Sequence, residues 1–329
     1  MNVGESFGHF IDVRTWEKTD LLADTDVFVG VEIELEHFHP VNFDPYKKQI
    51  LNSSLWRTVN DHSLRDNGLE FVMGYHGDPL KGKDIITALS VFQTHIDKYI
   101  SKNEPPECSD RTSIHVHIDV RDLEIEDVKR YVLLYSIFEN VFYKWSDYAR
   151  YFNNYCVPIS RSKDLSGRLS KLMSVNSGIN FNSAIVSGHK YDGLNYKSIQ
   201  IKGSLEFRLL RGTYDTKFIL DWINLLLCLR IAAKDKSLDI TSIPKDMSNR
   251  GLDKLVDEVF GPYGEVLKDS VNPVDILEGL RVAQGLIIYK DIVKEAKKFG
   301  IIPLEKEDLL NNFKKTLSKD YILPVDEDE

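Results

Sequence analysis

Cysteine is scarce in this chain, and the sequence contains no long hydrophobic run and no excess of positive charge. The three cysteines, Cys108, Cys156 and Cys228, are odd in number and far apart, which argues against a disulfide framework or a cysteine-based zinc site. Such usage suits a reducing cytoplasm, where we expect the protein to act. The first residues show no basic region followed by an apolar stretch, so we expect no secretory signal.

Acidic residues outnumber basic ones, which gives a formal net charge of −9. A protein that binds nucleic acid through its overall charge needs an excess of basic residues, so no nucleic-acid partner is expected. The most apolar segment, residues 218–233, is interrupted by Asp221, Asn224 and Arg230. It is too short and too polar to cross a bilayer, so no membrane partner is expected either.

What the chain does contain is ordinary globular composition, with 329 residues of which 42% are hydrophobic and 28% are charged. In four segments, apolar residues recur at every second position, with charged or imidazole side chains between them at one or more positions. These segments are residues 27–35, 69–73, 114–120 and 205–209. A strand places alternate residues on opposite faces, so each segment has an apolar back and a charged front. This pattern predicts an antiparallel sheet with helices on one face and an open, polar second face.

Helical patterns lie between these segments, at residues 84–102, 128–145 and 217–233. Further helices are expected at residues 248–259, 274–289, 291–299 and 304–317. Without an internal repeat or a linker, the chain is expected to form an α+β domain over residues 1–235. Residues 236–329 are expected to form a helical portion packed on the same domain, ending in an acidic tail at residues 326–329.

The first charged front carries Glu32 and Glu34, about 6.6 Å apart along a strand that rises roughly 3.3 Å per residue. Two carboxylates at that distance repel by about 2.5 kcal/mol at an effective dielectric near 20, but by only about 0.6 kcal/mol in water. In a cleft the pair therefore needs a cation, basic partners or a protonated glutamate. Oxygen ligands suit Mg²⁺ or Mn²⁺. On an exposed edge strand, the same row would be a solvated face.

The later fronts add imidazole and guanidinium groups. His115 and His117 point the same way from a strand and could share a metal, zinc included, or serve a metal and a phosphate separately. Glu206 and Arg208 share a face, either as a salt bridge or as a metal-binding carboxylate beside a group that neutralises a phosphoryl group. Arg211 is a second phosphate candidate. Near the turn at residues 66–68, Asp61 and Ser63 are read as turn or capping residues.

In order, the motifs Gly-x-Glu-x-Glu, Asp-x-Ser-Leu…Gly-x-Glu, His-x-His and Glu-Phe-Arg…Arg-Gly-Thr resemble the amidoligases. These are relatives of glutamine synthetase and glutamate–cysteine ligase, often encoded by phages or bacterial gene clusters. The resemblance spans about residues 27–227. It implies a glutamine-synthetase-like catalytic domain with metals and ATP on the open face of the sheet. It also implies ATP-dependent amide formation between a small-molecule or peptide carboxylate and an amine, through an acyl phosphate.

The resemblance also implies roles for individual residues. The metal ligands for Mg²⁺ or Mn²⁺ are expected to be Glu32, Glu34, Glu70, His117 and Glu206. The nucleotide contacts are expected to be His115, Arg208 and Lys197, and the catalytic residues Arg208, Arg211 and Glu206. The sequence leaves open the identity of both substrates and whether the protein forms an oligomer.

The sequence departs from the family pattern at His62, at Ser113, at residues 73–79 and at residues 195–197. These departures concern the expected donor and acceptor pockets more than the expected metal ligands. Two other functions use the same residues or the same scaffold. One is a metal-dependent hydrolase on the Glu and His cluster, and the other is a non-catalytic binding or structural protein of a phage.

Overall fold

A six-stranded antiparallel sheet is the central feature of the computed structural model, which describes residues 22–74, 78–175, 178–185, 191–236, 238 and 248–298. The elements in chain order are β1 (Val29–Leu35), α2 (Pro40–Asn52), β2 (Trp56–Val59), β3 (Leu69–Met73), α3 (Lys83–Ile100), β4 (Ser113–Asp119), α4 (Ile125–Ser146), the 3-10 helix η1 (Tyr148–Phe152), α5 (Lys163–Met173), α6 (Gly178–Ile185), β5 (Leu194–Asn195), α7 (Ser198–Lys202), β6 (Ser204–Arg211), α8 (Thr216–Lys234), α9 (Asn249–Phe260), the 3-10 helix η3 (Gly261–Leu267) and α10 (Pro273–Lys298). The α+β class and the antiparallel sheet predicted from the sequence are confirmed.

The strands are ordered β2-β3-β1-β4-β6-β5, so the four segments with charged fronts are neighbours at the centre of the sheet. All five pairings are antiparallel. The register sets polar residues of adjacent strands opposite one another. The pairs are Glu34 with Glu70, Glu32 with His115, and His117 with Glu206. Because directly opposed residues share a face, the register gathers the charged side chains on one side of the sheet.

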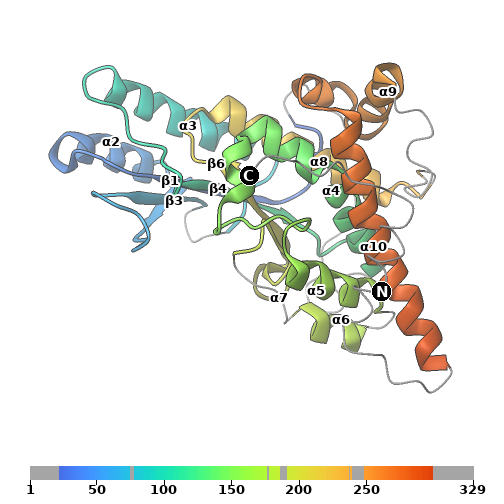
Figure 1. The fold of residues 1–329 in the computed structure, drawn as a ribbon. Coiled ribbons are helices and arrows are strands. Elements are labelled where there is room, and N and C mark those ends of the chain that lie inside the picture. Colours follow the sequence, from blue (N-terminus) through green and yellow to red (C-terminus); the bar gives the residue numbers. More distant parts are fainter. Residues whose placement is uncertain are drawn as a thin grey trace, which may run out of the picture.

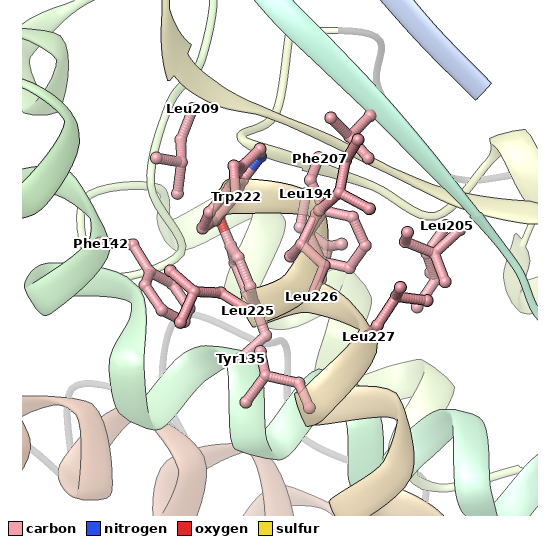
Figure 2. Packing of buried hydrophobic residues seen from close by; sticks show 14 of the residues in the cluster. Tyr135, Phe142, Leu194, Leu205, Phe207, Leu209, Trp222, Leu225, Leu226 and Leu227 are labelled. Carbon is pink, nitrogen blue, oxygen red and sulfur yellow. The ribbon is translucent and has the colours of Figure 1, made fainter. Parts of the chain in front are cut away.

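The apolar face of the sheet is covered by α3, α4 and α8 (Figure 1). Phe71 of β3 packs on Phe92 of α3 with ring centroids 5.2 Å apart, and Phe207 of β6 packs on Tyr135 of α4 at 5.1 Å. Trp222 of α8 lies against the same strand, as Figure 2 shows. These aromatic contacts bury large apolar areas and fix the sheet from behind. The opposite face is left to the polar side chains.

The helices after residue 248 pack beside this sheet and helix layer. Long α10 lies along α4 and α5 (Figure 1), and it contacts α4 closely at Gly279, where an added Cβ would lie 2.1 Å from the carbonyl oxygen of Ile137. The sequence predicted a break between residues 289 and 291, and this is wrong: α10 is continuous, since no proline or glycine interrupts it there. The expected helix at 304–317 and the acidic tail lie outside the described residues, so the helical C-terminal portion as a whole stays a prediction. Within the described ranges, no helix combines the length and apolar character that a bilayer requires.

Candidate functional site

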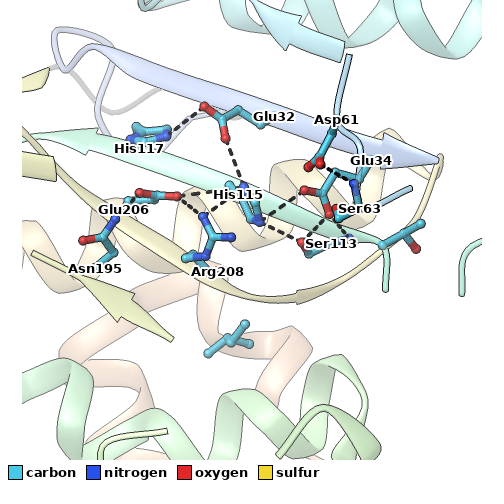
Figure 3. Close-up of polar contacts among 12 residues, drawn as sticks. Glu32, Glu34, Asp61, Ser63, Ser113, His115, His117, Asn195, Glu206 and Arg208 are labelled. Atoms are coloured by element: carbon cyan, nitrogen blue, oxygen red, sulfur yellow. Dashed lines mark hydrogen bonds and ion pairs between the residues drawn. The ribbon is translucent and has the colours of Figure 1, made fainter. Parts of the chain in front are cut away.

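A row of polar side chains crosses the open face of the sheet through β1, β4 and β6, as Figure 3 shows, and the register extends it to Glu70 of β3. Each strand contributes through the alternation seen in the sequence, because apolar neighbours such as Val31, Ile33 and Val116 are fully buried on the other face. Burying those neighbours fixes which way the acidic and imidazole groups point, since a slip of one residue would reverse both faces.

Three groups from three different strands converge at one place in this row. Glu32 of β1, His117 of β4 and Glu206 of β6 each offer one ligand atom, and these atoms all lie within 4.8 Å of one another. His117 and Glu206 are buried, while Glu32 is partly exposed. We call these three residues the metal cluster. The sequence assigned all three to a metal, and the structure brings them together.

The ring of His117 is held so that its two nitrogens face different partners. Nδ1 lies 3.2 Å from Oγ of Ser204 and 3.3 Å from Oγ of Ser198. Nε2 lies 3.3 Å from Oε1 of Glu32. A histidine ligand normally has its second ring nitrogen fixed by such an outer partner, and this sets the ring orientation. The serine hydroxyls provide that support here.

His115 connects the metal cluster to a second group of acidic residues. Its Nδ1 lies 3.0 Å from Oε2 of Glu32 and 3.9 Å from Oε1 of Glu206. Its Nε2 lies 2.7 Å from Oγ of Ser113 and 3.7 Å from Oε1 of Glu34. Ser113 also donates to Glu34 Oε2 through its hydroxyl at 2.6 Å and its backbone N–H at 2.8 Å. The imidazole therefore bridges both acidic groups.

The charges within the metal cluster offset the cost of burying its carboxylates. Burial opposes ionisation of Glu32, but hydrogen bonds from His115 and His117 outweigh it and hold its pKa well below the usual range. Burial also opposes ionisation of Glu206, and the charges of His117, Arg208 and His115 lower its pKa nonetheless. Both carboxylates are thus arranged to stay ionised, although Glu206 is buried and Glu32 is only partly exposed.

Glu70 and His115 shift in the opposite sense. Burial, together with the charges of Glu32 and Glu34, raises the pKa of Glu70 to about 7. Burial and the charge of Arg208 work against protonation of His115, but Glu34 and Glu32 outweigh them and raise its pKa. Neither Glu34 nor Glu70 belongs to the close set of three ligand atoms found among the described residues. They lie beside the metal cluster, on the neighbouring part of the row.

Arg208 and Asn195 fix the carboxylate of Glu206 from two sides. The guanidinium donates to Oε1, and the amide nitrogen of Asn195 donates to Oε2 at 2.6 Å. The Nε of Arg208 is buried and has no hydrogen-bond partner in the described part of the chain. Buried donors are seldom left unpaired, so this N–H is suited to receive a ligand oxygen beside the metal cluster.

The comparison with known families fits this geometry. Residues 103–230 match a family model described as "Putative amidoligase enzyme". The amidoligase resemblance is confirmed over this range. The matched stretch holds β4 and β6, with His115, His117, Glu206 and Arg208, whereas β1 and β3 precede it. A search of curated proteins returns no match. The family match indicates an enzyme, and one of the ligase type.

Two residues that the amidoligase resemblance assigned to the site have neither a hydrogen bond nor an ion pair to the metal cluster in the described part of the chain. Arg211 is exposed at the end of β6, with its guanidinium 5.3 Å from the ring centroid of Phe218. Lys197 precedes α7 and uses its backbone N–H to donate to Asn195 Oδ1 at 3.1 Å. Its ammonium forms no ion pair with any described residue. Their proposed roles therefore lack the direct contacts that support Arg208.

Asp61 and Ser63 behave as the sequence suggested. The backbone N–H of Ser63 donates to Oδ1 of Asp61 at 2.8 Å, which closes the turn before β3.

The structure also adds residues that sequence reasoning missed. Lys202 reaches the metal cluster from the end of α7, and Ser198, Ser204 and Asn195 provide the supporting hydrogen bonds described above. Helix α7 and strand β5 are only five and two residues long, too short to give a periodic pattern. The one available signal was Ser204, which directly precedes the alternating segment of β6.

Proposed function

We propose that this protein is an ATP- and Mg²⁺-dependent carboxylate–amine ligase that forms an amide bond on the open face of a glutamine-synthetase-like sheet. The observation that carries the proposal is the convergence of Glu32, His117 and Glu206 within 4.8 Å, beside the guanidinium of Arg208. The amidoligase match of residues 103–230 supports the ligase class. Acidic ligands next to a positive group are the arrangement that phosphoryl transfer needs.

The residues present fit a divalent cation. Two carboxylates and one imidazole are a donor set that Mg²⁺ or Mn²⁺ accepts. The lowered pKa values of Glu32 and Glu206 keep both carboxylates ionised at neutral pH. Glu34 lies on β1, as Glu32 does, and Glu70 lies opposite Glu34 on β3, so these two carboxylates could extend the site toward a further ion.

A bound Mg²⁺ would neutralise phosphate charge and polarise the phosphoryl oxygens. We expect Glu32, His117 and Glu206 to hold it, and Arg208 to donate to an equatorial oxygen of the transferred group. A donor carboxylate oxygen would attack the γ-phosphorus, and ADP would leave with the electrons of the broken bond. The acceptor amine would then attack the acyl carbon, phosphate would leave, and the amine would give up its proton to a nearby carboxylate.

The direct test is an assay of purified protein with Mg²⁺, ATP and a broad pool of amino acids and short peptides. ADP release is expected only when metal and pool are both present, and mass spectrometry should find a condensed product lighter than its two precursors by one water. ADP release with no new amide across the pool would contradict ligation.

The same donor set would also serve a metal-dependent hydrolase, which needs a metal but no nucleotide. Thermal unfolding separates the two functions. If the protein is the proposed ligase, ATP with Mg²⁺ should raise the melting temperature above the value with Mg²⁺ alone. If Mg²⁺ or Zn²⁺ stabilises the protein and ATP adds nothing, the hydrolase is favoured.

A further inference from the structure

The ammonium group of Lys202 lies on the metal cluster. Its Nζ is 3.0 Å from Oε1 of Glu32 and 3.2 Å from Nε2 of His117. These are two of the three residues whose ligand atoms converge within 4.8 Å. A side-chain cation thus contacts two of the groups that would bind a metal ion.

Helix α7 contacts both nitrogens of the His117 ring. Ser198, at its start, lies 3.3 Å from Nδ1, and Lys202, at its end, lies 3.2 Å from Nε2. Residues four apart share one side of a helix, so a single turn holds the imidazole from both sides. Nε2 can donate to Oε1 of Glu32 only when it carries a proton, so it cannot make that hydrogen bond and accept one from the Lys202 ammonium at the same time. In the form that accepts from the ammonium, Nε2 has a free lone pair and the proton is on Nδ1. This is the form in which Nε2 could bind a metal.

The backbone fixes the position of the Lys202 Cα atom but leaves the side chain free to move. Gly203 follows it with a φ of 71°, a left-handed conformation that ends α7 and starts β6. The Lys202 side chain is 51% exposed, in contrast to the buried groups that it contacts. It can therefore swing into solvent while α7 stays in place.

We infer that Lys202 is the resident cation of the metal-free site, and that a divalent ion must displace its ammonium from Glu32 and His117 to bind. This inference rests on the metal-dependent function proposed above. In the metal-free protein the ammonium offsets the repulsion between Glu32 and Glu206. A metal ion can bind only while Lys202 is withdrawn. The apparent metal affinity is therefore the intrinsic affinity multiplied by the fraction of time that the lysine is withdrawn.

The test measures Mn²⁺ binding, without nucleotide, to the wild-type protein and to Lys202→Met and Lys197→Met. Lys202→Met is expected to bind Mn²⁺ about tenfold more tightly than wild type, because no displacement is needed. Lys197→Met removes one positive charge from the same segment without a contact to the cluster, so it controls for net charge, and a change of less than about twofold is expected.

Lys202→Met binding Mn²⁺ no more tightly than wild type or Lys197→Met would overturn the inference while leaving the proposed metal site intact. Failure of all three proteins to bind Mn²⁺ would instead refute the metal-dependent function, and the inference with it.

A second measurement uses only the wild-type chain. Brief labelling with acetic anhydride, followed by mass spectrometry of peptides, compares the reactivity of Lys202 and Lys197 with and without Mg²⁺. Displacement by the metal should raise acetylation of Lys202 several-fold and leave Lys197 unchanged. Equal labelling of Lys202 under conditions where Mg²⁺ is bound would contradict displacement, whether or not the methionine variant folds.

Discussion

Two buried glutamates show how differently the same side chain behaves in two regions of this molecule. Glu206, on the polar face of the sheet, is 6% exposed, and Glu139, within α4, is 1% exposed. Burial opposes ionisation of both. Beside Glu206 the charges of His117 and Arg208 reverse that effect and lower its pKa.

Glu139 has hydrogen bonds, but no cation lies beside it among the described residues. The backbone N–H of Ile159 donates to Oε2 at 2.9 Å, and that of Ser160 does so at 3.5 Å. Burial dominates, and the pKa of Glu139 rises to about 8. Burial alone therefore does not mark a functional acid. The cations around Glu206 distinguish a carboxylate that is kept ionised on the polar face from one that satisfies two loop N–H groups.

The largest difference is expected in activity and metal binding. Glu206→Gln removes a charged ligand at the metal cluster, so ATP-dependent product formation should fall about a thousandfold. Mn²⁺ affinity should fall with it. Glu139→Gln is the same change at an equally buried site, and it should keep activity within about threefold of wild type. Equal losses in both variants would show that the two glutamates do not differ as described.

A large effect on the pH dependence of stability is expected when Glu139 is replaced. Since the folded-state pKa of Glu139 is about 8, above its ordinary value of 4.5, the folded protein binds more protons than the unfolded chain between these pH values. This contribution stabilises the fold at low pH and is lost as pH rises from about 4.5 to 8, with an upper limit of about 5 kcal/mol. Urea unfolding at pH 5 to 8 should show a shallower pH dependence for Glu139→Gln. Parallel curves for variant and wild type would contradict the raised pKa.

Glu70 tests the same comparison of glutamates at a partly exposed position. Its pKa of about 7 also lies above its ordinary value of 4.5, so its ionisation destabilises the metal-free fold as pH rises toward 8. Because the group is partly exposed, we expect Glu70→Gln to stabilise the metal-free protein by only about 1 kcal/mol at pH 8. At pH 5 the gain should vanish. Glu104→Gln, at an exposed glutamate, serves as the control and should change stability at neither pH.

The smallest effect is expected among the groups that orient His117. Ser198 and Ser204 both face Nδ1, so either hydroxyl can substitute for the other. Each single serine-to-alanine change should weaken Mn²⁺ binding by no more than about threefold, whereas the double change should weaken it by about tenfold or more. Isothermal titration of the four proteins measures this. Additive losses would mean that the hydroxyls act independently.

Most of the polar row could be predicted from the sequence because strand alternation is a strong local signal. Apolar residues every second position indicated β1, β3, β4 and β6, and this placed Glu32, Glu34 and Glu70 on one face together with both histidines. Their convergence depends on strand order and register, which spacing within one strand does not contain. The expectation that the fronts converge came instead from their side chains, which share the ability to bind metal and phosphate.

Other parts could not be predicted because their signals are short or interrupted. The register between β4 and β6 shifts, so that Ile114 pairs with Leu210 while Val116 pairs with Phe207. The extra residue on β6 breaks the alternation beyond Arg208, so spacing from Glu206 does not give the face of Arg211. Lys202 lies on a helix of five residues that no periodicity reveals.

The close contact at Gly279 connects helix α10, through α4, to the strand that carries Glu206. A side chain there would collide with the Ile137 carbonyl of α4, so the two helices would have to separate. Two residues before Ile137, Tyr135 supports the ring of Phe207, which directly follows Glu206 in β6. A Gly279→Ala change would therefore disturb the support beneath Glu206, although every polar group on the opposite face of the sheet would still be present.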